Sequence, residues 1–380
     1  MARARLLGTA ADVDAADWDR LAGTANPFAT HAFFTSLEES GSATAASGWR
    51  PLHIGVEDGE GRLAGLLPGY LKQHSQGEYV FDHGWADAWM RAGHAYYPKL
   101  QFATPFTPAT APKLLAADAD TRALLVAAGE TLVRQHGLSS AHATFLTDAD
   151  AESFAARGWL ERNDLQYHWR NDGGWRGFAD FLGALSSRRR KGLRHEREQA
   201  LAAVDSIDWL TGRELTEAVW DDFFAFYQDT GGRKWGRPYL TRDFFSLVGE
   251  RMAARVLLIL ARRGGRYVAG ALNFLGDDCL YGRQWGCIED IPYLHFELCY
   301  HQAIDFACQN GLARVEAGAQ GEHKLARGYR PVRTRSMHYL PDPGFRDAVA
   351  EYLARERPAV AAAAAALERA LPVRKGAAPA

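Results

Sequence analysis

Residues that could carry out proton transfer and stabilise negative charge gather between positions 279 and 338. The run RVEAGAQG contains Glu316, and the run EHKLARGY that follows it contains His323 and Lys324. A carboxylate or an imidazole can accept the proton of an attacking amine, and a fixed ammonium suits the oxyanion of a tetrahedral intermediate. We therefore predict a catalytic group made of Lys324, Glu316 and His323.

Each of these residues also has a structural interpretation. Arg314 and Glu316 are two apart on a predicted strand, so they share one face and can form an ion pair. Lys324 can pair with the adjacent Glu322 at the surface, and His323 can be a satisfied structural group. The sequence leaves both interpretations open for all three residues.

Cations beside aromatic rings and glycines form a second set, which we predict to bind substrate. Arg283 and Trp285 alternate on a predicted strand and so project from one face, where a guanidinium and an indole can stack and hold an anion. The glycines of GGRKWGRPY permit close approach of a ligand. The complete predicted set is Arg283, Trp285, Lys234, Trp235, Arg327 and Tyr329 in the C-terminal half, with Lys99, Lys72 and Asp82 in the N-terminal half.

A compact basic run, RRRK at positions 188–191, lies near the start of a predicted helix. Acidic residues follow at Glu196 and Glu198, so the helix can be a solvated, charge-paired one. The same cations can instead contact a phosphate-bearing substrate. Both interpretations remain open.

The composition is that of an ordinary globular chain and excludes several classes of protein. Its 380 residues are 47% hydrophobic and 24% charged, with a formal net charge of −2, so no global basic field indicates DNA binding. No run approaches the roughly 18 apolar residues of a membrane helix, and no signal peptide is evident. The four cysteines form no CxxC pair, which favours free thiols over a metal site. We expect a cytoplasmic protein without a metal.

The elements that must position these residues repeat along the chain. LAGLL followed by EYV in the first half matches VAGAL followed by CLY in the second, and VRQHGLSSAHATFL matches ACQNGLARVEAGAQ. Self-similarity at an interval of roughly 170 residues indicates a duplicated domain. We predict domains over residues 1–176 and 177–345, the second with a basic entry helix.

Three local predictions complete this outline. EYVFD at 78–82 is expected to be the third strand of a meander. The proline-punctuated run KLQFATPFTPATAPK is expected to be an irregular connection. Residues 346–380 are expected to form a helix pair broken near Pro358 and a frayed tail.

Several motifs in this order, NPFATHAF, LYGRQWGC, LHFELCYHQAI and EAGAQGEHKLARGY, resemble the FemAB-like group of N-acyltransferases in the GNAT superfamily. The resemblance covers nearly the whole chain. It implies an α/β (α+β) fold of two tandem GNAT-like domains, each a mixed, mostly antiparallel sheet flanked by helices. It also implies acyl transfer to an amine, with Lys324 in a closing segment beside the reacting carbonyl.

The resemblance leaves the acyl donor open. The wider superfamily uses acyl-coenzyme A, which we expect as the co-substrate, with a small-molecule amine as acceptor and no tightly bound cofactor. Members that bind coenzyme A usually have a glycine-spaced Q/R-x-x-G-x-G/A turn, whereas GRQWGCIEDIPY here carries Glu289 and Asp290. Two alternatives follow: a Fem-type transferase that takes aminoacyl groups from tRNA for a cell-wall precursor, and a non-catalytic GNAT-like binding module.

Overall fold

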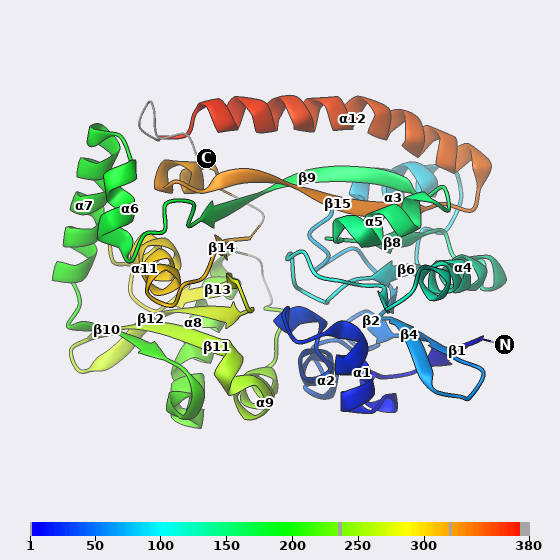
Figure 1. Cartoon of the computed structure of the whole chain (residues 1–380), viewed down its shortest axis with the longest axis horizontal. Coiled ribbons are helices and arrows are strands. Elements are labelled where there is room, and N and C mark those ends of the chain that lie inside the picture. The colour runs from blue at the N-terminus through cyan, green and yellow to red at the C-terminus, as the bar shows by residue number, and fades with distance from the viewer. Residues whose placement is uncertain (1, 235–237, 319–320, 373–380) are drawn as a thin grey trace. The chain divides into compact units, whose positions relative to one another are not determined.

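The computed structural model describes residues 2–234, 238–318 and 321–372 (Figure 1). The chain forms two units. The first contains the residues up to 164 together with 333–362, and the second contains 165–332 together with the residues from 363. These ranges differ from the predicted 1–176 and 177–345 because two strands, β9 (Leu160–Arg170) and β15 (Arg330–Tyr339), each contribute residues to both units.

The first unit combines two sets of strands with helices. An antiparallel sheet contains β1 (Arg3–Leu7), β3 (His53–Glu57), β4 (Leu63–Leu67) and β7 (Leu115–Ala116). A second run of paired strands contains β2 (Trp49–Pro51), β5 (Tyr70–Lys72), β6 (Lys99–Phe102), β8 (Ala141–Ala143) and β15. The helices are α1 (Ala15–Ala22), α2 (His31–Glu39), α3 (His83–Arg91), α4 (Ala119–Gln135), α5 (Asp148–Ala155) and the first part of α12 (Pro343–Arg369).

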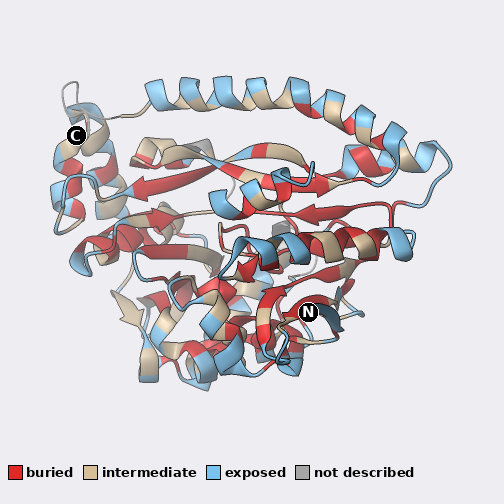
Figure 2. Cartoon of the chain, turned by 45° about the vertical axis from the view of Figure 1, so that its right-hand side comes forward, coloured by how far each residue is buried: buried red, intermediate tan, exposed pale blue. Residues whose placement is uncertain are grey.

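The core of this unit forms where α4 lies on its strands. Asp118 caps the helix by accepting a hydrogen bond from the Thr121 N–H at 2.8 Å. Leu125 and Val133 of α4 are fully buried and pack in one cluster with Phe102 of β6. In Figure 2 the strands are mostly buried, whereas α12 is mostly exposed.

The second unit is one mixed sheet with a helix layer on each face. Its strands, in spatial order, are β10 (Ser206–Leu210), β11 (Val256–Arg263), β12 (Arg266–Leu275), β13 (Cys279–Cys287), β14 (Arg314–Glu316) and β9. Its helices are α6 (Phe178–Ala184), α7 (Ser187–Ala202), α8 (Glu217–Lys234), α9 (Arg242–Met252), and α10 (Leu294–Phe296) continued by a π-helical turn (Glu297–His301) and α11 (Gln302–Gln309). A 3-10 helix, η6 (Glu322–Arg327), precedes β15.

Both units repeat one topology, as the internal repeat predicts. In the first, β5 and β6 are antiparallel, β6 and β8 are parallel, and β8 pairs antiparallel with β15. In the second, β12 and β13 are antiparallel, β13 and β14 are parallel, and β14 pairs antiparallel with β9. The predicted tandem GNAT-like fold is confirmed.

The three local predictions are wrong, the second and third of them in part. EYVFD is a loop, in which Tyr79 has φ of +60°, because Glu78 and Asp82 turn inward to pair with Lys99. The strand is instead KLQF, β6, within the run predicted to be irregular. Pro358 lies inside α12 and does not break it. The proline is exposed, so water can solvate the carbonyl that loses its N–H donor.

Close packing between β13 and α8 makes Gly286 essential to the second unit. A Cβ on Gly286 would lie 2.3 Å from the backbone carbonyl oxygen of Phe226. Gly286→Ala should therefore destabilise the protein by about 1–3 kcal/mol, measured by urea unfolding. Gly192→Ala in α7 is the control, because nothing lies within 4 Å of that Cβ and alanine favours helix. Equal stability of the two variants would contradict this packing.

None of the helices in the described ranges has the length and apolar character needed to cross a membrane. The four cysteines are free thiols, with Cys279 and Cys308 buried.

Candidate functional site

The centre of the candidate site is the point where β13 and β14 stop pairing. The two strands run parallel from Cys279 opposite Arg314 to Tyr281 opposite Glu316, where β14 ends. The next residues on both strands line a cavity of about 110 Å³. Its lining includes Arg283, Trp285, His295, Cys299, Tyr300 and Ala317. We call this place the fork.

A β-bulge shapes the β13 side of the fork. Leu272 pairs with Gln284 and Asn273 with Gly282, so Arg283 is the extra residue. Bulges redirect side chains and often lie next to active sites. Trp285, beyond the bulge, packs edge-on against His295 with ring centroids 5.1 Å apart. Arg283 and Trp285 thus both line the cavity, and their binding of substrate stays a prediction.

The helix that covers the fork contains the π-helical turn. Glu297 in this turn is fully buried and bonded to His301 at 2.8 Å and Gln302 at 2.7 Å. Single π-helical turns inside helices occur frequently at functional sites. No sequence pattern indicates this turn, which carries Cys299 and Tyr300 into the cavity lining.

Lys324 in η6 is a buried cation with one hydrogen bond to the described residues. Its side chain is 3% exposed, and Nζ donates to the carbonyl oxygen of Gly318 at 3.0 Å. Within the described side chains, which do not include that of Glu322, no carboxylate lies at ion-pair distance. Burial lowers the pKa of Lys324 to about 8, so the ammonium persists at neutral pH. The ammonium therefore retains unused donors.

His323 and Arg327 surround Lys324 in the same 3-10 helix. His323 Nε2 lies 2.9 Å from the Tyr300 hydroxyl. Burial, and then the charges of Arg327 and Lys324, lower the pKa of His323, which keeps the ring neutral at pH 7. The His323 ring lies where a Cβ of residue 321 would be, and Gly321 has φ of +110°. Any larger residue at 321 would therefore displace the His323 ring.

Arg327 and Tyr329 are both buried. The Arg327 guanidinium lies 2.5 Å from Glu196 of α7, 2.9 Å from the His323 carbonyl and 3.5 Å from the Phe296 ring centroid. Tyr329 is fully buried and, in the described part of the chain, its hydroxyl has no hydrogen-bond partner. Arg327 therefore also has a structural role, tying α7 to the segment that carries Lys324.

Glu316 lies at the fork, but on the other face of the sheet. Leu280 and Val315 pack into the core beneath the covering helix, so Tyr281 and Glu316 point the opposite way. Glu316 contacts Arg314 at 3.3 Å, the ion pair that its strand spacing allows. Burial raises the pKa of Glu316 to about 7, against the opposing charge of Arg314.

The structure brings His323 and Lys324 together but not Glu316 with them. In residues 2–234, 238–318 and 321–372, no hydrogen bond or ion pair joins Glu316 to either residue. His168 of β9, which was not among the predicted residues, lies 3.7 Å from Glu316. Its only signal would have been the pairing of two strands far apart in the sequence. Trp235 lies outside the described residues, as does the side chain of Lys234.

The predicted N-terminal residues belong to a buried network of hydrogen bonds and ion pairs. Lys99 is fully buried and contacts Glu78 at 2.7 Å, Ser75 at 2.8 Å and Asp82. Burial lowers the pKa of Lys99, but the charges of Glu78 and Asp82 raise it above its usual value. Lys72, also fully buried, lies 3.7 Å above the Trp49 ring. These ion pairs give Lys72, Lys99 and Asp82 a structural role.

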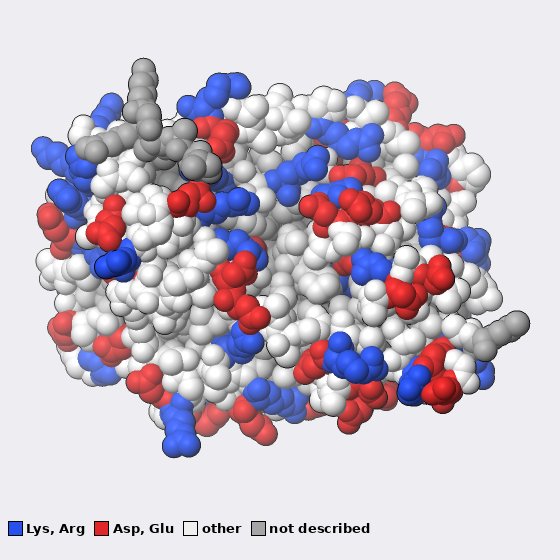
Figure 3. Space-filling model, viewed as in Figure 1, with Lys and Arg blue, Asp and Glu red and all other residues white. Residues whose placement is uncertain are grey.

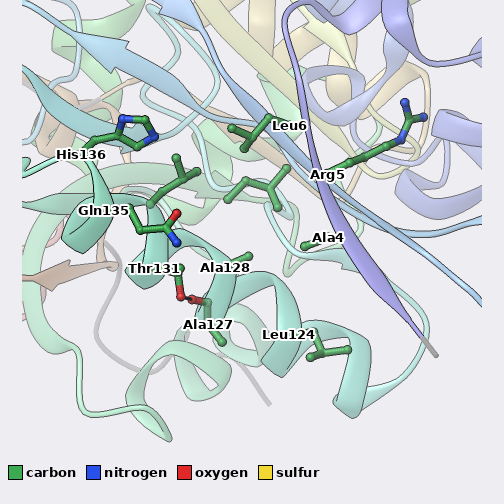
Figure 4. A pocket seen from close by; sticks show the side chains of 11 residues that line it. Ala4, Arg5, Leu6, Leu124, Ala127, Ala128, Thr131, Gln135 and His136 are labelled. Carbon is green, nitrogen blue, oxygen red and sulfur yellow. Dashed lines mark hydrogen bonds between the residues drawn. The ribbon is translucent and has the colours of Figure 1, made fainter.

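A separate cavity of about 380 Å³ in the first unit lies between β1 and α4 (Figure 4). Leu6, Leu124 and other mostly apolar residues line it, and Arg5 and His136 are its ionisable groups. It lacks the set of proton-transfer groups found at the fork. Among the described residues, no three His, Cys, Asp or Glu side chains are arranged to hold a metal ion.

In the acidic turn after β13, Glu289 is paired with two arginines. Glu289 pairs with Arg263 at 3.0 Å and Arg266 at 2.8 Å. Because two cations neutralise one carboxylate, this turn presents no excess negative charge at Glu289.

Known structures share this fold at low sequence identity. FemX has a TM-score of 0.54 at 8% identity, covering 91% of this chain and 100% of its own. The C-terminal domain of a putative lysylphosphatidylglycerol synthetase from Agrobacterium fabrum has a TM-score of 0.52 at 10% identity, covering 91% of this chain and 97% of its own. L-PGS from Bacillus licheniformis has a TM-score of 0.51 at 11% identity, covering 84% of this chain and 96% of its own. No curated protein matches the chain.

The sequence itself matches a family model along nearly its whole length. The FemAB-like model, described as peptidoglycan biosynthesis/recognition, matches residues 9–375. The chain therefore belongs to the FemAB-like family, a family of acyltransferases related to peptidoglycan synthesis.

Proposed function

We propose that the protein is an N-acyltransferase that moves an acyl group from an acyl-coenzyme A thioester to a small-molecule amine in the cytoplasm. The amine nitrogen attacks the thioester carbonyl, and a C–N bond forms. The C–S bond then breaks, and coenzyme A leaves as the thiol after protonation. The amine loses one proton, which a group at the fork accepts.

The observation that carries this proposal is the pair of ionisable groups on opposite faces of the fork. A carbonyl held in the fork would direct its oxygen toward Lys324, whose ammonium has unused donors. Glu316, on the other face, would accept the amine proton. His323 is the alternative acceptor, on the side of Lys324. A fixed cation at a developing oxyanion is an effective source of rate acceleration.

The edge of β13 supports a thioester donor. The pairing with β14 ends at Tyr281, while β13 continues to Cys287. In the described part of the chain no strand pairs with β13 beyond this point on that side. The amide-bearing arm of coenzyme A could hydrogen-bond to that edge as an added strand does. Arg283 and Arg327, with Lys234, would hold anionic parts of the substrates.

One observation favours the second candidate, aminoacyl-tRNA as donor. Arg188, Arg189, Arg190 and Lys191 occupy the first turn of α7, where cations oppose the helix dipole. Among the described residues none of the four forms an ion pair. Figure 3 shows basic side chains over α7, although charges of both signs are mixed over the rest of that face. RNA phosphates would satisfy these cations.

Thermal unfolding with and without ligand tests the donor. Acetyl-coenzyme A, longer acyl-coenzyme A thioesters or coenzyme A at 100 times its Kd would add about 2.7 kcal/mol to the stability. We expect the melting temperature to rise by about 5 °C. A rise only with charged tRNA, weakening as salt increases, would instead establish the second candidate. No rise with any donor would favour a non-catalytic binding module.

A further inference from the structure

Strand β9 places His168 directly opposite Glu316 in the β9–β14 ladder. His168 Nε2 lies 3.7 Å from Glu316 Oε2 and 3.3 Å from Gln166 Oε1. Both His168 and Glu316 are nearly completely buried. Within the described residues Glu316 Oε2 has no hydrogen-bond partner. An amide oxygen only accepts hydrogen bonds. Nε2 of His168 therefore carries the hydrogen and donates a hydrogen bond to Gln166 Oε1.

The surroundings keep His168 neutral. Burial, followed by the charges of Arg314, Arg170 and Lys324, lowers the pKa of His168 to about 3. The imidazole is therefore a neutral N–H donor throughout the range in which enzymes work. The charged and titratable groups around this pair are Arg314 of β14, Asp278 before β13, Cys279 and Tyr281 of β13, Arg170 of β9, and Lys324.

The first unit repeats this arrangement with a different outcome. His338 of β15 lies opposite His142 of β8, and their Nδ1 atoms are 2.7 Å apart. His142 is further bonded to Ser140 at 2.8 Å, within the buried network around Asp82. In each unit, the strand next to the parallel pair, β15 or β9, thus places a histidine beside an ionisable residue, which is His142 of β8 or Glu316 of β14. In the second unit that residue is a carboxylate, and one of its oxygens has no hydrogen-bond partner in the described part of the chain, so the histidine has an acceptor in reach.

We propose that His168 is a positioning residue that turns its Nε2–H from Gln166 to Glu316 Oε2 when Glu316 ionises, and so prepares the carboxylate to accept the amine proton. The movement is under about 1 Å, the difference between 3.7 Å and a hydrogen-bond length. This inference rests on the proposed function, in which Glu316 accepts that proton. His168 itself touches neither substrate.

Titration of Glu316 by NMR tests the coupling without requiring activity. The full-length protein is labelled with ¹³C at the glutamate carboxyl carbon, and Glu316→Gln assigns the signal. His168→Leu removes the donor, so the pKa of Glu316 should rise by about one unit or more. His168→Gln keeps an N–H donor and should restore much of the shift. Gln166→Leu removes the competing acceptor and should lower the pKa.

The pH dependence of kcat then separates this inference from the proposed function. The acidic limb of the profile should move with the Glu316 titration in each variant, while KM stays nearly constant. An unchanged Glu316 titration in both His168→Leu and Gln166→Leu would overturn the role of His168. A shifted titration with an unshifted acidic limb would overturn Glu316 as the proton acceptor, and with it the catalytic use of His168.

Discussion

Replacement of Lys324 by alanine should lower kcat by about a hundredfold or more, with little change in KM. The ammonium is held beside the fork by one hydrogen bond to Gly318, and it has no carboxylate partner among the described side chains. An oxyanion that forms during the reaction would take its remaining donors, whereas the ground-state carbonyl needs them much less. Loss of an interaction made only in the transition state lowers kcat and kcat/KM together.

The measurement is steady-state kinetics with the donor identified by thermal unfolding. Arg355→Ala is a matched control, because Arg355 is an exposed cation on α12 that pairs with Glu351 at 3.0 Å. That variant should keep full activity. The melting temperature of the Lys324→Ala protein should not fall, since removal of a buried cation without a counter-charge relieves a desolvation cost. A well-folded Lys324→Ala enzyme with full kcat would remove Lys324 from the mechanism.

The parts of the site that are local in sequence could be predicted, and the parts made by distant strands could not. Lys324, His323 and Arg327 follow one another in one short segment, so their clustering in η6 needs only a single turn of helix. The Arg314–Glu316 ion pair follows from strand alternation alone. His168 precedes Glu316 by well over a hundred residues, and their contact depends on β9 pairing with β14.

The loop at 78–82 shows a different limit of sequence reasoning. Its aromatic and β-branched residues, which follow a turn, are typical of a strand, and KLQFATPFTPATAPK has the prolines of a loop. The structure reverses both, because the fully buried Lys99 on β6 requires nearby carboxylates, and Glu78 and Asp82 supply them. The free energy of compensating a buried charge exceeds the local strand preference of a five-residue run. Such long-range pairing leaves no local signal.

Lys99→Met should destabilise the first unit by about 3–5 kcal/mol, because it leaves Glu78 and Asp82 buried without their shared cation. Lys72→Met is the matched control in the same network. Burial lowers the pKa of Lys72 to about 7, so this lysine is partly neutral near pH 7 and its loss removes less charge. We expect that variant to lose only about 1 kcal/mol. Hydrogen exchange of β6 and β8 amides in the full-length protein measures both losses.

The pH dependence of the Lys99→Met loss separates charge compensation from a simple packing defect. In the wild type, burial raises the pKa of Asp82, but Lys99, His142 and hydrogen bonds lower it below its usual range. Ionised Asp82 therefore stabilises the fold above about pH 4, and this stabilisation is lost as pH falls.

Without Lys99, burial would raise the pKa of Asp82 above the unfolded value, so the folded variant would bind more protons than the unfolded chain. The difference in stability between wild type and Lys99→Met should then be largest near pH 8 and shrink toward pH 5. A loss of equal size at both pH values would mean that Lys99 stabilises β6 by filling space, not by neutralising the two carboxylates.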